Sequence, residues 1–207
     1  LRLDDAAVME FSVGSAQAAF GAPYAPYDEP GTRCPRMPGP PYLTMSRVQD
    51  VEGPAMEVAA PRTVVMAYDV HPEAWYFRPH TGESMPFAIL LETALQPCGW
   101  LTAWQGQSIR SDKSLYFRNL GGTATQFAEI WPDVGTLTTR ATQTSVSEAG
   151  GLMVQFYRST VYAGDTKIFE TETHFGYFDD SALANQKGLQ PPESEEQRRV
   201  AARETAA

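Results

Sequence analysis

Residues 70–104 read VHPEAWYFRPHTGESMPFAILLETALQPCGWLTAW. From about Pro86 to Trp104, apolar side chains fall on nearly every side of a helical wheel, so a helix here has no solvated face. Such a helix must be buried all round. We therefore predict one long buried helix over residues 86–104, with the rest of the chain folded around it.

A candidate base precedes this predicted helix, and a candidate acid lies inside it. Glu92 lies inside it, and Gln96 follows one turn later on the same side. A carboxylate in a buried helix must be paired, protonated or turned toward a pocket. The turn-rich segment PHTGES, residues 79–84, places His80 close to the start of the helix. His80 and Glu92 are therefore the candidate catalytic residues.

Composition restricts the class of protein. With 207 residues, 43% of them hydrophobic and 20% charged, the chain resembles one compact globular domain with extensions. No run of about 18 apolar residues is uninterrupted, so we predict no membrane span. The formal net charge of -9 opposes nucleic-acid binding, which relies on Lys and Arg neutralising phosphates. Three histidines, with no Cys or His at metal-ligand spacing, predict no metal site.

The cysteines and the N-terminus bear on cellular location. Cys34 lies in a proline-rich segment and Cys98 in the predicted buried helix, and we expect both to be free thiols of a reducing compartment. The first residues do not have the pattern of a signal peptide. These features predict a cytoplasmic protein. The chain begins with Leu1, which suggests a piece of a longer polypeptide.

We divide the chain into three parts. Residues 1–41 are predicted to form an N-terminal helix and an extended arm, because seven prolines between positions 23 and 41 prevent regular structure. Residues 42–180 are predicted to form the folded domain. Residues 181–207, which end in PPESEEQRRVAARETAA, are predicted to be a linker or a solvated tail.

Period-two patterns rich in Thr, Val, Phe and Tyr predict strands on both sides of the helix. The expected strands cover residues 42–51, 62–70, 115–119, 125–131, 135–146, 152–163 and 167–178. We predict that Gly121 and Gly122 form a turn between two of them. One long helix followed by long strands predicts an α+β domain whose antiparallel sheet wraps the helix.

Several segments, taken in order, resemble a known family. They are AAFG with the proline-rich arm, YLTMSRVQDVEG, YDVHPEAWYFRPH, MPFAILLETALQPCGW and KSLYFRNLGGTATQFAEIWP. The chain resembles the hotdog-fold 3-hydroxyacyl-[acyl carrier protein] dehydratases from about residue 14 to residue 178. The likeness is to FabA-like dehydratase domains of polyketide and polyunsaturated fatty acid synthases in particular. It implies a hotdog fold with MPFAILLETALQPCGW as its central helix.

The resemblance also implies roles for individual residues. His80 is similar in position to the family's catalytic histidine, and Glu92 to the acid on its central helix. His80 would remove a proton from C2 of a 3-hydroxyacyl thioester, and Glu92 would protonate or orient the departing hydroxyl group. Backbone N–H groups at the helix start would polarise the thioester carbonyl. The substrate-binding candidates of this implied site are Gly82, Met85, Phe87 and Gln96, although the spacing also suits Gln96 as a helix-to-sheet hydrogen bonder.

The loop before the helix departs from the family pattern H-F-x-G-x-P-x-M-P-G. Here it reads HTGESMPF, which is two residues shorter, lacks the middle proline and has Phe87 in place of the last glycine. A glycine there lets a substrate approach the helix start closely. Two alternatives to a dehydratase therefore stay open: a catalytically degenerate hotdog module with a scaffolding role, and a hotdog thioesterase in which Glu92 activates water without His80.

The resemblance further implies partners. The acyl group would arrive on the phosphopantetheine of an acyl carrier protein, and the domain itself would need no cofactor. Hotdog domains pair as homodimers or with a second hotdog domain, and the family's site takes its histidine from one copy and its acid from the other. Because carrier proteins are acidic, we expect basic residues near the mouth of the site, with Arg110, Lys113 and Arg118 as candidates.

Overall fold

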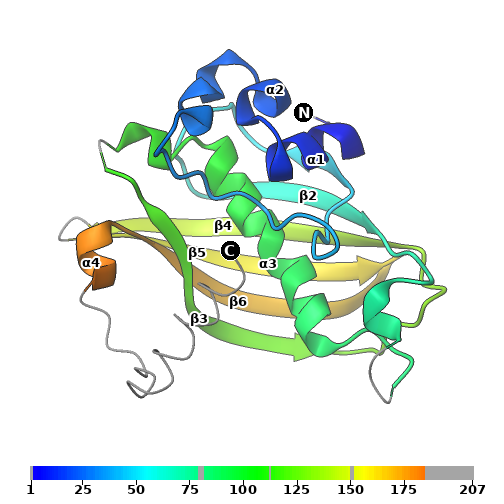
Figure 1. Cartoon of the computed structure of the whole chain (residues 1–207). Coiled ribbons are helices and arrows are strands. Elements are labelled where there is room, and N and C mark those ends of the chain that lie inside the picture. The colour runs from blue at the N-terminus through cyan, green and yellow to red at the C-terminus, as the bar shows by residue number, and fades with distance from the viewer. Residues whose placement is uncertain (1, 79–81, 112, 150–151, 185–207) are drawn as a thin grey trace, which may run out of the picture.

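The structure is a computed structural model that describes residues 2–78, 82–111, 113–149 and 152–184. A long helix, α3 (Phe87–Trp104), lies against an antiparallel six-stranded sheet of order β1-β2-β4-β5-β6-β3 (Figure 1). The strands are β1 (Arg47–Val51), β2 (Arg62–Asp69), β3 (Tyr116–Gln126), β4 (Thr136–Ala149), β5 (Leu152–Ala163) and β6 (Thr166–Phe178). The predicted α+β hotdog architecture, with a central helix in an antiparallel sheet, is confirmed.

The N-terminal residues cover the C-terminal half of α3. They form α1 (Asp5–Val13), α2 (Ala16–Phe20) and η1 (Ala22–Asp28). The ring of Phe20 lies 5.4 Å from that of Trp100, and the Tyr24 hydroxyl donates a hydrogen bond to the Trp104 carbonyl. The proline-rich segment of residues 29–46 then crosses α3 on the side away from the sheet (Figure 1). Further short helices are η2 (Trp75–Phe77), η3 (Ser108–Arg110) and α4 (Asp180–Ala184).

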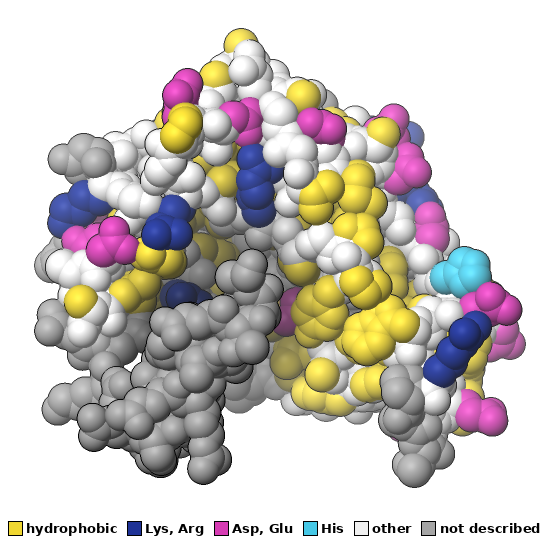
Figure 2. All heavy atoms as spheres, viewed as in Figure 1, with side chains coloured by type: hydrophobic (Ala, Val, Ile, Leu, Met, Phe, Trp, Pro, Cys, Tyr) yellow, Lys and Arg dark blue, Asp and Glu magenta, His cyan; other side chains and the backbone are white. Residues whose placement is uncertain are grey.

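One prediction about α3 is wrong for the single chain. Leu90 and Ala94 face the sheet and are fully buried, but Phe87 is 47% exposed. Ala88 is exposed as well, and Leu91 and Leu95 are only half-buried. Figure 2 shows a group of hydrophobic side chains at the surface over the N-terminal half of α3. The sheet covers one side of the helix and the N-terminal segments cover the other end, so an apolar stripe remains open.

The glycine pair also differs from its prediction. Gly121 and Gly122 lie inside β3 rather than in a turn, so the two strands predicted at 115–119 and 125–131 give way to one, Tyr116–Gln126. A Cβ atom at position 122 would lie 2.3 Å from the Glu172 carbonyl oxygen of the neighbouring strand β6. Gly121 has a φ of 141° next to a register shift. Close strand approach, and not chain reversal, explains these glycines.

The two edges of the sheet differ. At one edge, the amide and carbonyl of Val48 in β1 pair with the backbone of Leu3 at 2.9 and 3.1 Å. At the other edge, β3 is an 11-residue strand that pairs on one side with β6. Within the described part of the chain, its second side has no neighbouring strand. A single bridge therefore covers part of the β1 edge, whereas the β3 edge is open within the described residues.

Pro97 lies inside α3 and has no N–H to donate to the Thr93 carbonyl four residues earlier. The buried hydroxyl of Thr139 in β4 donates to that carbonyl at 3.1 Å instead. The proline therefore frees an acceptor on the sheet side of the helix, and a side chain of the sheet satisfies it. This hydrogen bond fixes the height of α3 above β4.

We predict that Thr139→Val destabilises the chain by about 1–3 kcal/mol, because it leaves the Thr93 carbonyl buried without a donor. In a Pro97→Ala background the helix supplies its own N–H, so the same substitution is expected to cost less. A double-mutant cycle in urea unfolding measures the coupling. Additive costs of the two substitutions contradict the assignment.

Candidate functional site

Glu92 lies on the open side of α3, where its carboxyl group is half-buried. The Gln96 side-chain amide lies one turn away, with Nε2 3.4 Å from Glu92 Oε2. Burial raises the pKa of Tyr42, and the charge of the nearby Glu92 raises it further. The acid therefore lies beside an amide donor, with a phenol in its neighbourhood, and it is partly open to solvent.

Gln96 joins the helix to the segment before β1. Its Oε1 accepts a hydrogen bond from the Thr44 amide at 2.8 Å, and its Nε2 donates to the Tyr42 carbonyl at 2.9 Å. The side chain is 4% exposed. Residues 42–44 bond to this glutamine and not to a neighbouring strand, and β1 begins at Arg47, later than the predicted residue 42. Gln96 therefore anchors residues 42–44 beside Glu92. Its predicted contact with substrate stays a prediction.

The residues before α3 are anchored on both sides. Tyr76 is buried and its hydroxyl lies 2.9 Å from that of Tyr68 in β2. Met85, a predicted substrate-binding residue, is buried, and its amide donates to the Ile130 carbonyl at 2.7 Å. Gly82 lies between these anchors. His80 falls outside the described residues, so its meeting with Glu92 stays a prediction.

Phe87 begins α3 and packs against strand β6 of the sheet. Its ring centroid lies 5.5 Å from that of Phe169 in β6, with an interplanar angle of 58°. Glu92 follows five residues later, so the two side chains leave the helix about 140° apart. The ring therefore does not lie over the carboxyl group of the same chain. Within one copy, Phe87 therefore does not fill the space beside Glu92.

The start of α3 has the features of a site for a polarised carbonyl oxygen. Its N-cap is Pro86, which makes no side-chain capping bond, and no acid lies in the first turn. The first N–H groups of a helix have no intrahelical partner, and the helix dipole adds partial positive charge there. The amides of Phe87 and Ala88 are the two donors at this position.

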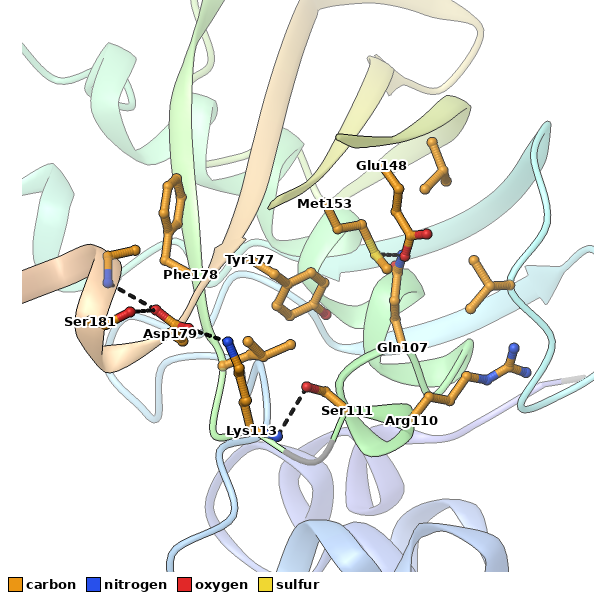
Figure 3. A pocket seen from close by; sticks show the side chains of 14 residues that line it. Gln107, Arg110, Ser111, Lys113, Glu148, Met153, Tyr177, Phe178, Asp179 and Ser181 are labelled. Atoms are coloured by element: carbon orange, nitrogen blue, oxygen red, sulfur yellow. Dashed lines mark hydrogen bonds and ion pairs between the residues drawn. The ribbon is translucent and has the colours of Figure 1, made fainter. Parts of the chain in front are cut away.

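A cavity of about 920 Å³ lies beyond the C-terminal end of α3. Figure 3 shows Tyr177 and Gln107 on its inner side, with Arg110 and Lys113 at its rim. The Lys113 ammonium pairs with Asp179 at 2.7 Å, and the Arg110 guanidinium donates to the Met56 carbonyl. About 18 Å of helix separate Glu92 from Trp104, the last residue of α3. This cavity is distinct from the Glu92 region.

The predicted basic residues do not lie together. Arg110 and Lys113 are at the rim of the large cavity, whereas Arg118 in β3 lines a smaller one beside the proline-rich segment. Arg33 also lines the smaller cavity, and sequence reasoning missed it. No local pattern marks Arg33, because it is one charge inside a segment that was interpreted as a surface arm.

A comparison with protein families now identifies the chain. The model of the FabA-like domain matches residues 37–172. The chain belongs to the FabA-like domain family. The resemblance to FabA-like dehydratase domains is thereby confirmed over these residues, whereas AAFG and the proline-rich residues before position 37 lie outside the match. The match covers α3, Glu92 and five of the six strands in full.

Single relatives and structures are more distant. A subunit of the polyunsaturated fatty acid synthase of Thraustochytrium sp. is 29% identical over 131 residues, which are 61% of this chain and 9% of that protein. The chain thus spans about a tenth of that relative's length. The dehydratase heterocomplex ApeI:P from Xenorhabdus doucetiae is 14% identical, with a TM-score of 0.49 over 74% of this chain and 95% of that chain. A point mutant of the fluoroacetyl-CoA-specific thioesterase FlK is 14% identical, with a TM-score of 0.45 over 61% of this chain and 92% of that chain.

The described residues contain neither a membrane-spanning helix nor a cluster of metal ligands. No helix in the described ranges is both long and apolar enough to cross a membrane. Among the same residues, no three of His, Cys, Asp and Glu are grouped closely enough to hold a metal ion.

We predict that Gln96→Met destabilises the chain by about 1–3 kcal/mol for each backbone group left unpaired, namely the Thr44 amide and the Tyr42 carbonyl. Urea unfolding followed by tryptophan fluorescence measures the loss. The control is Gln17→Met on the exposed face of α2, which is expected to change stability by no more than about 0.5 kcal/mol. Equal effects of the two substitutions contradict the anchoring role.

Proposed function

We propose that this domain dehydrates a 3-hydroxyacyl thioester, carried on acyl carrier protein, to a trans-2-enoyl thioester. The observation that carries the proposal is the half-open carboxyl group of Glu92 on the central helix of a FabA-like domain. The hydrogen bonds of Gln96 hold residues 42–44 next to this carboxyl group. The proposal places the reaction in the cytoplasm, in a fatty acid or polyketide synthase.

The proposed chemistry is a balanced elimination. Neutral His80 takes the C2 proton, and the electrons of that bond form the C2–C3 double bond. The C3–O bond breaks, Glu92 gives its proton to the departing hydroxyl group, and water leaves. The amides of Phe87 and Ala88 stabilise the negative charge on the thioester oxygen as the C2 proton leaves. The elimination needs no cofactor, and a later proton transfer from His80 to Glu92 restores both groups.

We propose that the domain works in a pair, either as a homodimer or with a second hotdog domain. The apolar stripe of Phe87, Ala88, Leu91 and Leu95 is open in the single chain. The open edge of β3 offers unpaired backbone groups to a second sheet. Glu92 lies beside the same stripe, and the proposal takes the histidine of each site from the second copy.

Phe87 favours a second candidate function. The family keeps a glycine where this chain has an exposed phenylalanine at the helix start. In a pair, that ring extends toward the partner and occupies space that a substrate needs. The second candidate is therefore a non-catalytic hotdog module that supports an active neighbour.

We expect His80→Ala and Glu92→Gln each to lower the dehydration rate by about 10²–10⁴-fold, because each removes one half of the acid–base pair. The assay incubates the domain with a 3-hydroxyacyl carrier protein and follows the loss of water by mass spectrometry. His71→Ala, an exposed residue outside the site, is the control and keeps the full rate.

Other outcomes separate the alternatives. Release of a free carrier thiol that needs Glu92 but not His80 indicates a thioesterase. Wild-type protein that loses no water, and gains activity with Phe87→Gly, indicates that the ring blocks the site. If neither the wild-type protein nor the Phe87→Gly variant catalyses the loss of water, the result supports the scaffold module.

We also predict that Ala88→Glu breaks the pair. Ala88 is exposed in the single chain, so the charge does not harm its fold, but in the pair it is buried without a partner. Light scattering coupled to size exclusion is expected to show a shift from dimer to monomer. Val13→Glu places the same charge on a 62% exposed residue of α1 and leaves the dimer intact. A monomeric wild-type chain contradicts the homodimer.

A further inference from the structure

The proposed function makes no use of the cavity of about 920 Å³ beyond the C-terminal end of α3. Five apolar side chains on its walls are only half-buried, so that each keeps surface open to the cavity: Val58, Leu115, Val146, Met153 and Phe178. Sites for small molecules commonly have a volume of this order and an apolar lining with a few polar groups. The cavity is therefore a candidate site for a second ligand.

A buried polar network ends at the inner side of this cavity. Its members are joined side chain to side chain and are each at most 3% exposed: Gln107, Thr102, Gln155, Tyr157, Gln143 and Gln105. At the cavity end, the Thr102 hydroxyl donates to Gln107 Oε1 at 3.0 Å. This hydrogen bond fixes the orientation of the Gln107 amide, with Nε2 directed toward Met153 on the cavity wall (Figure 3).

Gln107 keeps a donor without a strong acceptor. Within the described residues, the acceptor of its Nε2 is the thioether sulfur of Met153, and a thioether is a weak acceptor. A buried N–H group without a full-strength partner costs free energy, and an oxygen atom of a ligand recovers it. The Met153 side chain is unbranched and flexible, so its sulfur can move aside for such an atom.

Arg110 follows Gln107 by one turn of η3. Gln107 has helical dihedral angles of φ -64° and ψ -45°, and side chains three positions apart are eclipsed in a 3-10 helix. The Arg110 guanidinium donates to the Met56 carbonyl and forms no ion pair in the described part of the chain. The short helix η3 thus supplies a buried donor on the inner side of the cavity and a cationic donor at its rim.

The charges around the cavity favour a ligand with one negative charge. Two cations and two acids line it, and of these Lys113 pairs with Asp179 at 2.7 Å. Arg110 can offset one ligand charge, whereas a dianion would leave an excess of negative charge beside the exposed Glu148. A carboxylate accepts hydrogen bonds from both guanidinium and amide N–H groups, and it carries a single charge.

We infer that this cavity binds an aliphatic monocarboxylate, with its carboxylate at Gln107 and Arg110 and its hydrocarbon chain against the five apolar side chains. The free acid differs from the thioester of the proposed reaction, because it carries a charge that Arg110 recognises. About 18 Å of helix separate Glu92 from the last residue of α3, so the two ligands occupy different places. The inference therefore goes beyond the proposed function and does not depend on it.

Isothermal titration calorimetry with octanoate, octanol and octylammonium tests the site. The wild-type protein is expected to bind octanoate at least about tenfold more tightly than the other two, since octanoate alone forms charge-assisted hydrogen bonds with Arg110. Arg110→Gln is expected to remove this preference and to keep the wild-type Tm. Arg118→Gln removes an equal charge from β3, outside the cavity, and keeps the preference. Glu92→Gln is expected to keep the affinity for octanoate.

The side-chain amide of Gln107 reports on the site in the unaltered protein. Its signals in a ¹⁵N–¹H spectrum, assigned from their loss in Gln107→Met, are expected to shift with octanoate and not with octylammonium. Unshifted Gln107 signals at saturating octanoate overturn the inference. So do equal binding of the three compounds by the wild type, a preference that survives in Arg110→Gln, and loss of octanoate binding in Glu92→Gln. None of these measurements contains a thioester, so an inactive dehydratase leaves their outcome unchanged.

Discussion

The need to cover α3 on all sides is the constraint on which this structure depends. Apolar side chains surround the helix, but one sheet can cover only one side of it. The N-terminal helices and the proline-rich segment cover the C-terminal half, where Phe20 and Tyr24 pack on Trp100 and Trp104. The N-terminal half keeps an open stripe, and Glu92 lies beside it. The uncovered part of the core and the candidate acid therefore occupy the same surface.

Much of the fold was predictable from local patterns. Leu152–Ala163 and the helix up to Trp104 lie where the periodicity places them, because side-chain alternation and helical spacing are properties of neighbouring residues. Features that depend on distant residues were not predictable. The double glycine at 121 and 122 has the composition of a turn, and only the approach of Glu172 from β6 explains it. Likewise, a helical wheel counts apolar positions but does not say which partner covers them.

The candidate site shows the same division. Glu92 was identifiable because an acid in an apolar helix is locally anomalous, and Gln96 because it stands one turn away. Tyr42 and Arg33 were not, since each gains its meaning from a neighbour far away in sequence. Pro97 presents the intermediate case: the N–H that it lacks is evident from the sequence, but the hydroxyl of Thr139 that satisfies the freed Thr93 carbonyl is not.

The two hydrogen bonds of Gln96 to residues 42–44 have a consequence for which substitutions the chain tolerates. Both contacts are to main-chain atoms, so the restraint is indifferent to the side chains at positions 42 and 44. Tolerance to substitution is therefore unevenly shared between the two segments that meet there. Position 96 needs a side chain with both an amide donor and a carbonyl acceptor, whereas these two hydrogen bonds set no requirement on the side chains at positions 42 and 44.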